Sequence, residues 1–557
     1  MKKGIYILIA LLGLMFTSCS QSVLDIPQKS VDDLDTYLAN AGEDEVAKLT
    51  AAVYYGMHSF YNRPWFLVAN EITGENYTGG SDISDQPYHV KFSTHAITSD
   101  NGQLQESWNN LYNLIYRCNL IIDKIEGSEA YKQRAIAEAK ASRAYAFYHL
   151  VMQWGTPPLV DHLLEPDEYE MANTPAEQTW ALIEKDLSDA AAVLPSKAGK
   201  NGQKAIGGRW TKEACIGYLA KAQLAQKKYS DAAANLKKII DTNLYDLIPN
   251  YGDIMRCAGD FCEEYLLEFD FDAADRTQAG SIRNDYYNYN GLRPSLINHP
   301  DELWNNSWGF LNVTKAFAIE AIEHDGNGPR RMANVVTYDE FVKNKAAGDP
   351  GAIFTYTKRK PGINAANNWY GSDGYARLKG LTYMNDKDMI GSSNDSYAFS
   401  NANIPLLRYA DILLMYAECA ANGAGDKTLG LECLNKVRRR AGLADAPALD
   451  MDNATYGIKA ERRFEFYFEN AERWYDLLRW GDFVKEMGRI LNTYGVGRYY
   501  PLMYADSKTD QGPAGWHVEY PYVLEWQAVD EHHTLLPIPY NEIVNNKNLV
   551  QNPGYGG

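Results

Sequence analysis

The stretch ERRFEFYFENAERWYDLLRWGDF, residues 461–483, brings carboxylates, arginines and aromatic rings together without a proline. Placed on one helix, it carries apolar side chains along two of its sides, which predicts a buried helix. An unpaired charge is costly to bury, so the ionic side chains of a buried helix need partners. Helical spacing offers three pairs: Arg462 with Glu465, Glu469 with Arg473, and Asp476 with Arg479.

A structural role and a catalytic role require different pKa values of these carboxylates. Carboxylates with arginine partners tend towards a low pKa. The acid of a glycosidase needs a raised pKa beside an open pocket. We therefore interpret residues 461–483 as a structural ion-pair segment, with catalysis and a partner interface as the alternatives.

The composition indicates a large globular protein with an acidic balance. The chain has 557 residues, enough for more than one structural unit, and 45% of them are hydrophobic. The net charge of −18 leaves no basic excess to neutralise phosphates, so we expect no nucleic-acid partner. Tyr outnumbers Phe by 40 to 17. Tyrosine suits interfaces and hydrated grooves because its ring has an apolar face and a polar edge.

The N-terminus has the pattern of a lipoprotein signal peptide. Lys2 and Lys3 precede an apolar run at residues 5–16 that is too short to span a membrane. The run leads into FTSCS, where small residues before Cys19 resemble a lipobox with Phe in place of the usual Leu. We predict a signal peptide at residues 1–18 and a lipidated Cys19 that begins a tether at residues 19–40. Ordinary secretion is the alternative.

Helical patterns occupy both flanks of the chain, and an irregular region separates them. Residues 41–252 contain helical segments close to the tetratricopeptide helix–turn–helix pattern, in blocks of varying length. In residues 253–403, Gly, Asn, Asp, Tyr and Trp are frequent and long helical periods fade. Helices return in residues 404–557, before a mostly irregular tail. Because long loops in a compact fold are often functional, we predict that residues 253–403 form the ligand-binding part.

Cysteine and acidic residues suggest at most one metal site. Most of the six cysteines after Cys19 lie in helical apolar patterns, whereas Cys257 and Cys262 are close enough for a disulfide that the sequence leaves open. The stretch EFDFDAADR groups carboxylates that could bind calcium, although their spacing differs from that of an EF-hand. These carboxylates are Asp270, Asp272 and Asp275. We expect no cofactor, with calcium as the alternative to a solvated acidic loop.

Six stretches, in order along most of the chain, resemble the SusD/RagB family. They are KASRAYAFYHLVMQWGTPPLV, IEKDLSDAAAVLP, LLRYADILLMYAECA, LNKVRRRAGL, residues 461–483 and LLPIPYNEIVNNKNLVQNPGY. The resemblance implies a mainly α fold, with a helical scaffold of four tetratricopeptide-like helix pairs and a large irregular part that binds the ligand.

The resemblance also implies a function. Members of this family are outer-membrane lipoproteins that capture nutrients, mostly glycans, and deliver them to a SusC-like TonB-dependent transporter without catalysis. It implies that this chain is lipid-anchored, faces the cell exterior and binds an oligosaccharide or polysaccharide. Binding of peptide or another nutrient is the alternative. A glycoside hydrolase and a scaffold that binds only proteins are less favoured, and no common hydrolase motif occurs.

Loop composition predicts where a glycan would bind. A sugar ring has a flat C–H face and a fringe of hydroxyls, so its site combines an aromatic plane with polar side chains. Residues 65–89, 286–308 and 367–377 have this composition, and Trp304 and Trp369 are the first candidates for stacking. The predicted ligand-binding residues are Trp65, Tyr77, Asp82, Asp85, Tyr88, His89, Trp304, Asn305, Trp369, Tyr370, Asp373 and Arg377.

Overall fold

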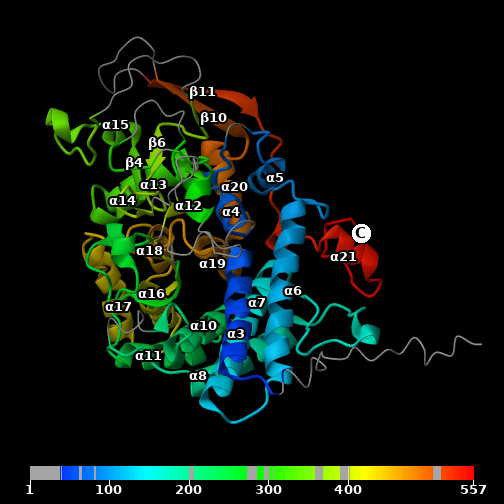
Figure 1. The fold of residues 1–557 in the computed structure, drawn as a ribbon. Helices are drawn as coiled ribbons and strands as arrows, with labels where there is room; N and C mark the ends of the chain where they lie inside the picture. Colours follow the sequence, from blue (N-terminus) through cyan, green and yellow to red (C-terminus); the bar gives the residue numbers. More distant parts are fainter. Residues whose placement is uncertain are drawn as a thin grey trace, which may run out of the picture.

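The computed structural model describes residues 38, 40–61, 65–80, 83–199, 206–271, 285–293, 300–304, 306–357, 368–388, 399–400, 402–505 and 516–556. Helices dominate these residues (Figure 1). Within this part of the chain, no helix has the length and apolar character that crossing a bilayer requires. The predicted signal peptide, Cys19 and most of the tether lie outside the described residues.

The N-terminal flank is built from helices. They are α3 (Glu43–Phe60), α4 (Phe66–Glu71), α5 (Pro87–Ser93), α6 (Gly102–Lys124), α7 (Ala130–Trp154), α8 (Ala176–Val193), α10 (Lys212–Ala225) and α11 (Tyr229–Asp241). Capping side chains fix where helices begin. The Asn101 side chain accepts a hydrogen bond from the Gln103 N–H at 2.9 Å, directly before α6.

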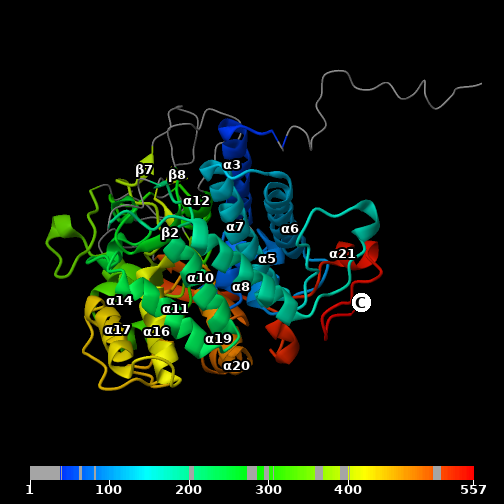
Figure 2. The same cartoon turned by 90° about the horizontal axis from the view of Figure 1, so that it is seen from below.

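Helix pairs form the scaffold. Within the described residues, α3 packs on α6, α7 on α8, α10 on α11, and α16 (Tyr409–Ala421) on α17 (Lys427–Arg440). Contacts of α6 with α7, α8 with α10 and α11 with α16 join each pair to the next (Figure 2). The prediction of a mainly helical fold is confirmed. The tetratricopeptide-like character of these pairs stays a prediction.

Glycines allow two close contacts in this scaffold. A Cβ atom at Gly217 of α10 would lie 2.5 Å from Leu407 Cδ2. A Cβ atom at Gly430 of α17 would lie 2.5 Å from the Cβ of Ala420 in α16. A larger side chain at either position would push the packed elements apart.

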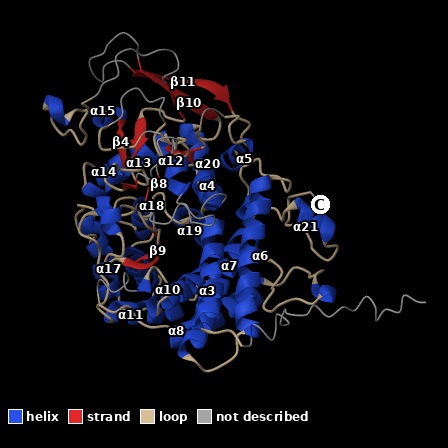
Figure 3. Cartoon of the chain, viewed as in Figure 1, coloured by secondary structure: helices blue, strands red, loops and turns tan. Residues whose placement is uncertain are grey.

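Short elements connect the two helical flanks (Figure 3). The helices are α12 (Asp285–Asn290), α13 (Lys315–Asp325), α14 (Pro329–Asn334) and α15 (Tyr338–Phe341). The strands are β1 (Asn76–Tyr77), β2 (Tyr265–Phe269), β3 (Asn312–Val313), β4 (Val335–Thr337), β5 (Asn368–Tyr370), β6 (Tyr375–Arg377), β7 (Lys387–Asp388), β8 (Phe399–Ser400) and β9 (Ile404–Arg408). The antiparallel pairs β1–β3, β2–β9 and β4–β6 join parts of the chain that are distant in sequence, and β7 pairs with the nearby β8.

The C-terminal flank adds helices and a β-hairpin. The helices are α18 (Ile458–Glu465), α19 (Glu472–Trp480), α20 (Phe483–Tyr494) and α21 (Tyr540–Asn545). The hairpin strands β10 (Tyr499–Ala505) and β11 (Trp516–Val523) join β5 in an antiparallel sheet of order β11-β10-β5. The sequence analysis missed this hairpin, which lies at the top of the molecule in Figure 1.

Residues 461–483 do not form the single helix that we predicted. The chain leaves helical geometry between α18 and α19, where Phe468, Asn470 and Ala471 have φ values of 65°, 42° and 58°. The Asn470 side chain donates to the Pro405 carbonyl oxygen at 2.6 Å. The surrounding contacts hold this left-handed backbone, which a continuous helix would not need.

Most ionic side chains of this segment are buried, and many pair with residues far away in the chain. Arg462 is 1% exposed and pairs with Asp411 and Asp476, each at 2.7 Å, rather than with Glu465. The predicted pair of Asp476 with Arg479 is confirmed at 2.7 Å.

The remaining predicted pair, Glu469 with Arg473, is replaced by other contacts. Glu469 pairs with Lys379 and Arg408. Arg473, its predicted partner, bonds instead to Glu486 at 2.7 Å. In two of the three predicted pairs, partners on other elements therefore replace the local partner that helical spacing indicated.

Glu465 shows what the arginines do to a buried carboxylate. Its side chain is fully buried beside Arg440 at 2.5 Å, Arg408 at 3.0 Å and Arg330 at 3.3 Å. Burial alone raises the pKa of a carboxyl. The fields of Arg440, Arg408 and Arg330 outweigh burial and hold the pKa of Glu465 at about 2. Such a carboxylate stays ionised, which agrees with a structural role.

Arg462→Met tests the buried ion-pair network. We expect the variant to lose roughly 3–5 kcal/mol of unfolding free energy, because it leaves the buried Asp411 and Asp476 with one partner fewer. Urea denaturation gives the change in midpoint. The control is Arg439→Met, which removes solvent-exposed pairs with Glu432 and Asp445 and should move the midpoint little. Equal shifts in both variants would contradict a dominant role for the buried network.

Candidate functional site

The first and third loop regions predicted to bind a ligand contact the segment that directly follows the second region, at residues 309–312. The Gly80 N–H donates to the Gly309 carbonyl oxygen at 3.2 Å. Asn312 of β3 donates to the Tyr370 carbonyl oxygen at 2.7 Å and accepts from the Trp369 indole N–H at 3.3 Å. The Asn312 side chain therefore connects two of these segments by hydrogen bonds, although it was not among the predicted residues.

A pocket of about 350 Å³ lies beside this junction. We call it the tyrosine pocket, and its described lining is Tyr77, Lys315, Asp373, Thr493, Tyr494, Gly495, Tyr499 and Tyr520. Tyr77 and Asp373 are predicted residues that the fold brings together. The other tyrosines come from the end of α20 and from the β10–β11 hairpin.

Asp373 places a hydrogen-bond acceptor in the tyrosine pocket. Its Oδ2 atom accepts from the Tyr77 hydroxyl at 3.0 Å and from the Lys315 backbone N–H at 3.3 Å. Its buried Oδ1 atom has no hydrogen-bond partner among the described residues. Burial raises the pKa of Asp373 to about 7, even though the hydrogen bond from Tyr77 lowers it. The group therefore titrates near neutral pH, and one of its buried oxygens has no hydrogen-bond partner among the described residues.

Tyrosine rings form the outer part of the pocket. Tyr499 and Tyr520 are 41% and 47% exposed, and their ring centroids lie 6.2 Å apart. Each offers an apolar face and a hydroxyl to a bound molecule. With one carboxylate and one lysine in the described lining, the pocket suits a neutral ligand rich in hydroxyl groups.

Two predicted tryptophans are buried, which corrects the expectation that they present rings to a ligand. Trp65 is 1% exposed and packs against Phe60, with ring centroids 5.2 Å apart. Trp369 is 6% exposed and packs against Phe341 at 5.7 Å in a second hydrophobic cluster beneath the hairpin. Tryptophan has a large apolar surface, so core packing wins at both positions.

His89 and Arg377 are also buried, and their polar groups serve the fold. His89 is 2% exposed, with Nδ1 2.9 Å from the Glu71 carboxylate. Arg377 is 3% exposed and donates to backbone carbonyl oxygens, including that of Leu311 at 2.9 Å. Neither side chain is available to a ligand in this conformation.

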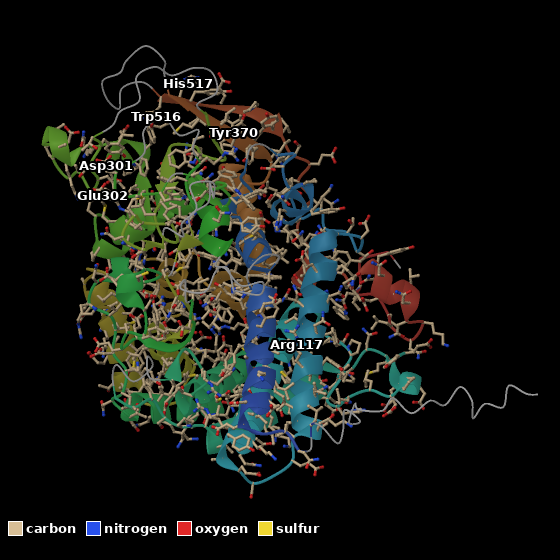
Figure 4. All side chains as sticks on the ribbon, in the orientation of Figure 1. Arg117, Asp301, Glu302, Tyr370, Trp516 and His517 are labelled. Atoms are coloured by element: carbon tan, nitrogen blue, oxygen red, sulfur yellow. The ribbon has the colours of Figure 1, made fainter. Side chains whose placement is uncertain are left out.

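The remaining predicted residues differ in exposure. Asp85 and Tyr88 are exposed, whereas Trp304 and Tyr370 are partly buried. Asp82 and Asn305 lie outside the described residues. Figure 4 shows Tyr370, Trp516 and His517 at the sheet of β5, β10 and β11, with Asp301 and Glu302, near Trp304 in the chain, lower in the view. The ligand-binding roles of these residues stay predictions.

The sequence analysis missed Tyr494, Tyr499 and Tyr520. Their signal is present in YGVGRYYPLMYA and WHVEYPYV, which are rich in the aromatic and β-branched residues typical of strands. The hairpin also pairs Tyr504 with His517, whose rings stack with centroids 5.2 Å apart. Reading these stretches as strands would have placed tyrosines near the predicted loops.

A larger cavity adjoins residues 461–483, and arginines pair with its partly buried carboxylates. It measures about 600 Å³, and α13, α19 and α20 contribute to its lining. Its partly buried carboxylates are paired: Glu486 with Arg489 at 2.8 Å, and Glu320 with the same arginine at 2.6 Å. The pKa of Glu486 is held at about 2, because the hydrogen bond and charge of Arg489 and its neighbours outweigh burial. A general acid needs the opposite shift.

The structure describes only part of the predicted calcium site. Asp270 is exposed at the end of β2, whereas Asp272 and Asp275 lie outside the described residues. The nearby Glu268 is buried and accepts from Asn403 at 2.9 Å. Calcium binding by the acidic stretch stays a prediction.

The disulfide that the sequence left open is not formed, and a second group of possible metal ligands is engaged in hydrogen bonds. Cys257 and Cys262 are free thiols, and burial raises the pKa of each to about 12. Asp530, His532 and His533 place ligand atoms within 4.8 Å of one another. His533 accepts from the Asp530 N–H at 3.2 Å and donates to a backbone carbonyl oxygen at 3.1 Å. A metal ion bound to His533 Nδ1 would have to displace the hydrogen bond from the Asp530 N–H.

Comparisons with known proteins agree with the fold. The chain is 25% identical over 524 residues to a SusD-like protein of Bacteroides ovatus, covering 88% of this chain and 85% of that protein. It is 22% identical to the starch-binding protein SusD of Bacteroides thetaiotaomicron, covering 79% of this chain and 76% of that protein. A solved laminarin-binding SusD-like protein superposes with a TM-score of 0.69 at 23% identity, over 92% of this chain and 99% of that chain.

A second solved structure and two family models complete the comparison. Surface glycan-binding protein A from Bacteroides thetaiotaomicron in complex with laminarihexaose superposes with a TM-score of 0.68 at 22% identity, over 91% of this chain and 99% of that chain. Residues 33–224 match a model described as starch-binding associating with outer membrane. Residues 263–555 match the SusD family model, which spans more than half of the chain. The chain therefore belongs to the SusD family.

Proposed function

We propose that this protein binds neutral glycans at the tyrosine pocket, at the bacterial surface, and passes them to a SusC-like TonB-dependent transporter. The observation that carries this proposal is the pairing of exposed tyrosine rings with the unpartnered Oδ1 atom of Asp373. A pyranose ring can stack on tyrosine while one of its hydroxyls donates to that oxygen. The solved relative with bound laminarihexaose supports a glycan as the ligand.

We propose binding without catalysis. Among the described residues that line the tyrosine pocket, Asp373 is the one carboxylate. Glycoside hydrolysis by the common mechanisms uses two carboxyl groups that flank the scissile bond. The starch-binding relative supports the same conclusion by its name. An assay for new reducing ends, with each bound glycan, tests this part of the proposal.

Peptide binding is the second candidate. In the described part of the sheet, β11 is an outer strand, and its side chains are largely exposed. A peptide could add to such an edge through backbone hydrogen bonds. The tyrosine pocket favours the glycan, because its rings and hydroxyls do not offer a row of backbone partners.

Tyr499→Ala and Tyr520→Ala test the glycan site. We expect micromolar to millimolar binding by the unaltered protein and a loss of about fivefold or more in each variant, because each removes a stacking ring. Affinity electrophoresis against a panel of neutral polysaccharides, followed by calorimetry, measures the change. The control is Tyr55→Ala, which removes a 44% exposed ring from α3, outside the pocket. Unchanged affinity in both pocket variants would reject this site.

Asp373 should make glycan affinity depend on pH. The pKa of about 7 means that the carboxyl takes up a proton between pH 8 and pH 6. If a ligand hydroxyl donates to Oδ1, binding favours the ionised form, so affinity should fall by up to about tenfold over that interval. Calorimetry at both pH values measures this, and Asp373→Asn should remove the dependence. Stronger binding at pH 6 would contradict an acceptor role.

Cys19→Ala tests the proposed lipid anchor. In a bacterial host we expect the unaltered chain to incorporate labelled palmitate and to sediment with membranes, since acyl chains hold a protein to a bilayer. The variant should lose the label and appear in the soluble fraction. Cys262→Ala, which removes a cysteine far from the N-terminus, serves as the control. Label retained in the Cys19 variant would show that acylation occurs elsewhere.

A further inference from the structure

A second pocket, of about 420 Å³, opens between α6, the segment at residues 158–171 and α21. Figure 1 places α6 and α21 beside each other, away from the β10–β11 hairpin, and Figure 2 agrees. A hydrogen bond of 2.7 Å between Gln105 of α6 and Glu542 of α21 confirms their contact. This α6–α21 pocket shares no described lining residue with the tyrosine pocket.

Aromatic rings form the floor and the rim of the α6–α21 pocket. Trp108 is 4% exposed and packs edge-on against Trp154, with centroids 5.2 Å apart. Tyr112 lies one helical turn further along α6, with its ring 5.0 Å from that of Trp108. Tyr169, from the segment at residues 158–171, also lines the pocket and is 64% exposed. The pocket therefore offers fixed rings below and an accessible ring at its edge.

Uncharged polar groups and one carboxylate surround these rings. Asn109 and Asn113 are exposed on the face of α6 that lines the pocket. Glu542 lines the far side, held by the Gln105 side chain. No arginine, lysine or histidine stands among the described lining residues. This lining does not favour a phosphate or another anion and offers donors and acceptors to a neutral molecule.

Hydrogen bonds hold the walls in place without a ligand. The Tyr112 hydroxyl donates to the Pro158 carbonyl oxygen at 2.8 Å. Asn119 donates to the Val160 carbonyl oxygen at 3.0 Å, and Asn546 donates to that of Met171 at 2.7 Å. A pocket that is ordered in advance loses little conformational entropy when it binds.

We propose that the α6–α21 pocket is a second binding site for a neutral oligosaccharide, separate from the tyrosine pocket. The inference rests on the proposed function, because it assumes that the protein binds glycans. Flat rings flanked by amides and a carboxylate match the C–H face and hydroxyl fringe of a sugar. Two sites on one chain would hold a long polysaccharide more tightly than either site alone, through a high effective concentration at the second site.

The experiment uses the full mature chain and neutral glycans found by affinity electrophoresis, with laminarihexaose and maltohexaose included in calorimetry. We expect two bound oligosaccharides per chain. Tyr169→Ala and Asn113→Ala should each weaken one of the two sites by about fivefold or more and leave the other unchanged. The matched control is Tyr116→Ala, a 57% exposed tyrosine of α6 that does not line the pocket.

The outcomes separate this inference from the proposed function. Loss of one site in Tyr169→Ala and of the other in Tyr499→Ala supports both. Loss only in Tyr499→Ala, with one oligosaccharide bound by the unaltered chain, overturns the second site and leaves the proposed function intact. Loss only in Tyr169→Ala supports the α6–α21 site and rejects the tyrosine pocket. Failure to bind any glycan in the panel overturns both. A Tyr169→Ala defect confined to association with another protein overturns the second site.

Discussion

The rest of the structure depends on two buried carboxylates, Glu465 and Glu469, at the break between α18 and α19. Arginines from α14, β9 and α17 converge on Glu465, and Arg408 and Lys379 share Glu469. Each partner comes from a different part of the chain, so this network joins the helical scaffold to the region of short strands. Removing one partner of such a buried ion pair is strongly destabilising, because no water is present to solvate the charge that remains. The network therefore constrains how the surrounding elements can be arranged.

The sequence predicted the nature of this network but not its partners. The many charged and aromatic residues of residues 461–483 indicated a buried segment, and its buried charges then needed partners. The ion pair of Arg462 with Asp476 is an example. Helical spacing reveals only neighbours three or four residues apart, so the contact of Glu465 with Arg330, 135 residues away, had no local signal. The same limit explains the error at Phe468, Asn470 and Ala471, because the contacts that hold their left-handed backbone come from elsewhere in the fold.

The candidate site was predictable in its chemistry and less so in its residues. Composition indicated loops that include Tyr77 and Asp373, and the fold brings these two side chains within 3.0 Å, whereas their role in binding stays a prediction. We expected tryptophans to present the exposed rings. Trp65 and Trp369 instead fill the core, and tyrosines of the β10–β11 hairpin supply the exposed rings. A tyrosine can remain half-exposed at lower cost, since its hydroxyl is hydrated while its ring contacts the protein. The long chain separation between Tyr77 and Tyr520 hid their proximity.

Asn312 connects the outer loops to one another, while Lys379, just beyond β6, ties the same region to Glu469 in the interior. These contacts use backbone carbonyl groups and a buried ion pair. They do not depend on which exposed side chains surround the tyrosine pocket. Substitutions at Tyr499, Tyr520 or Tyr370 can then accumulate without disturbing the attachment. Proteins that descend from one ancestral chain can in this way come to bind different ligands while they keep the same buried ion pairs and helix packing.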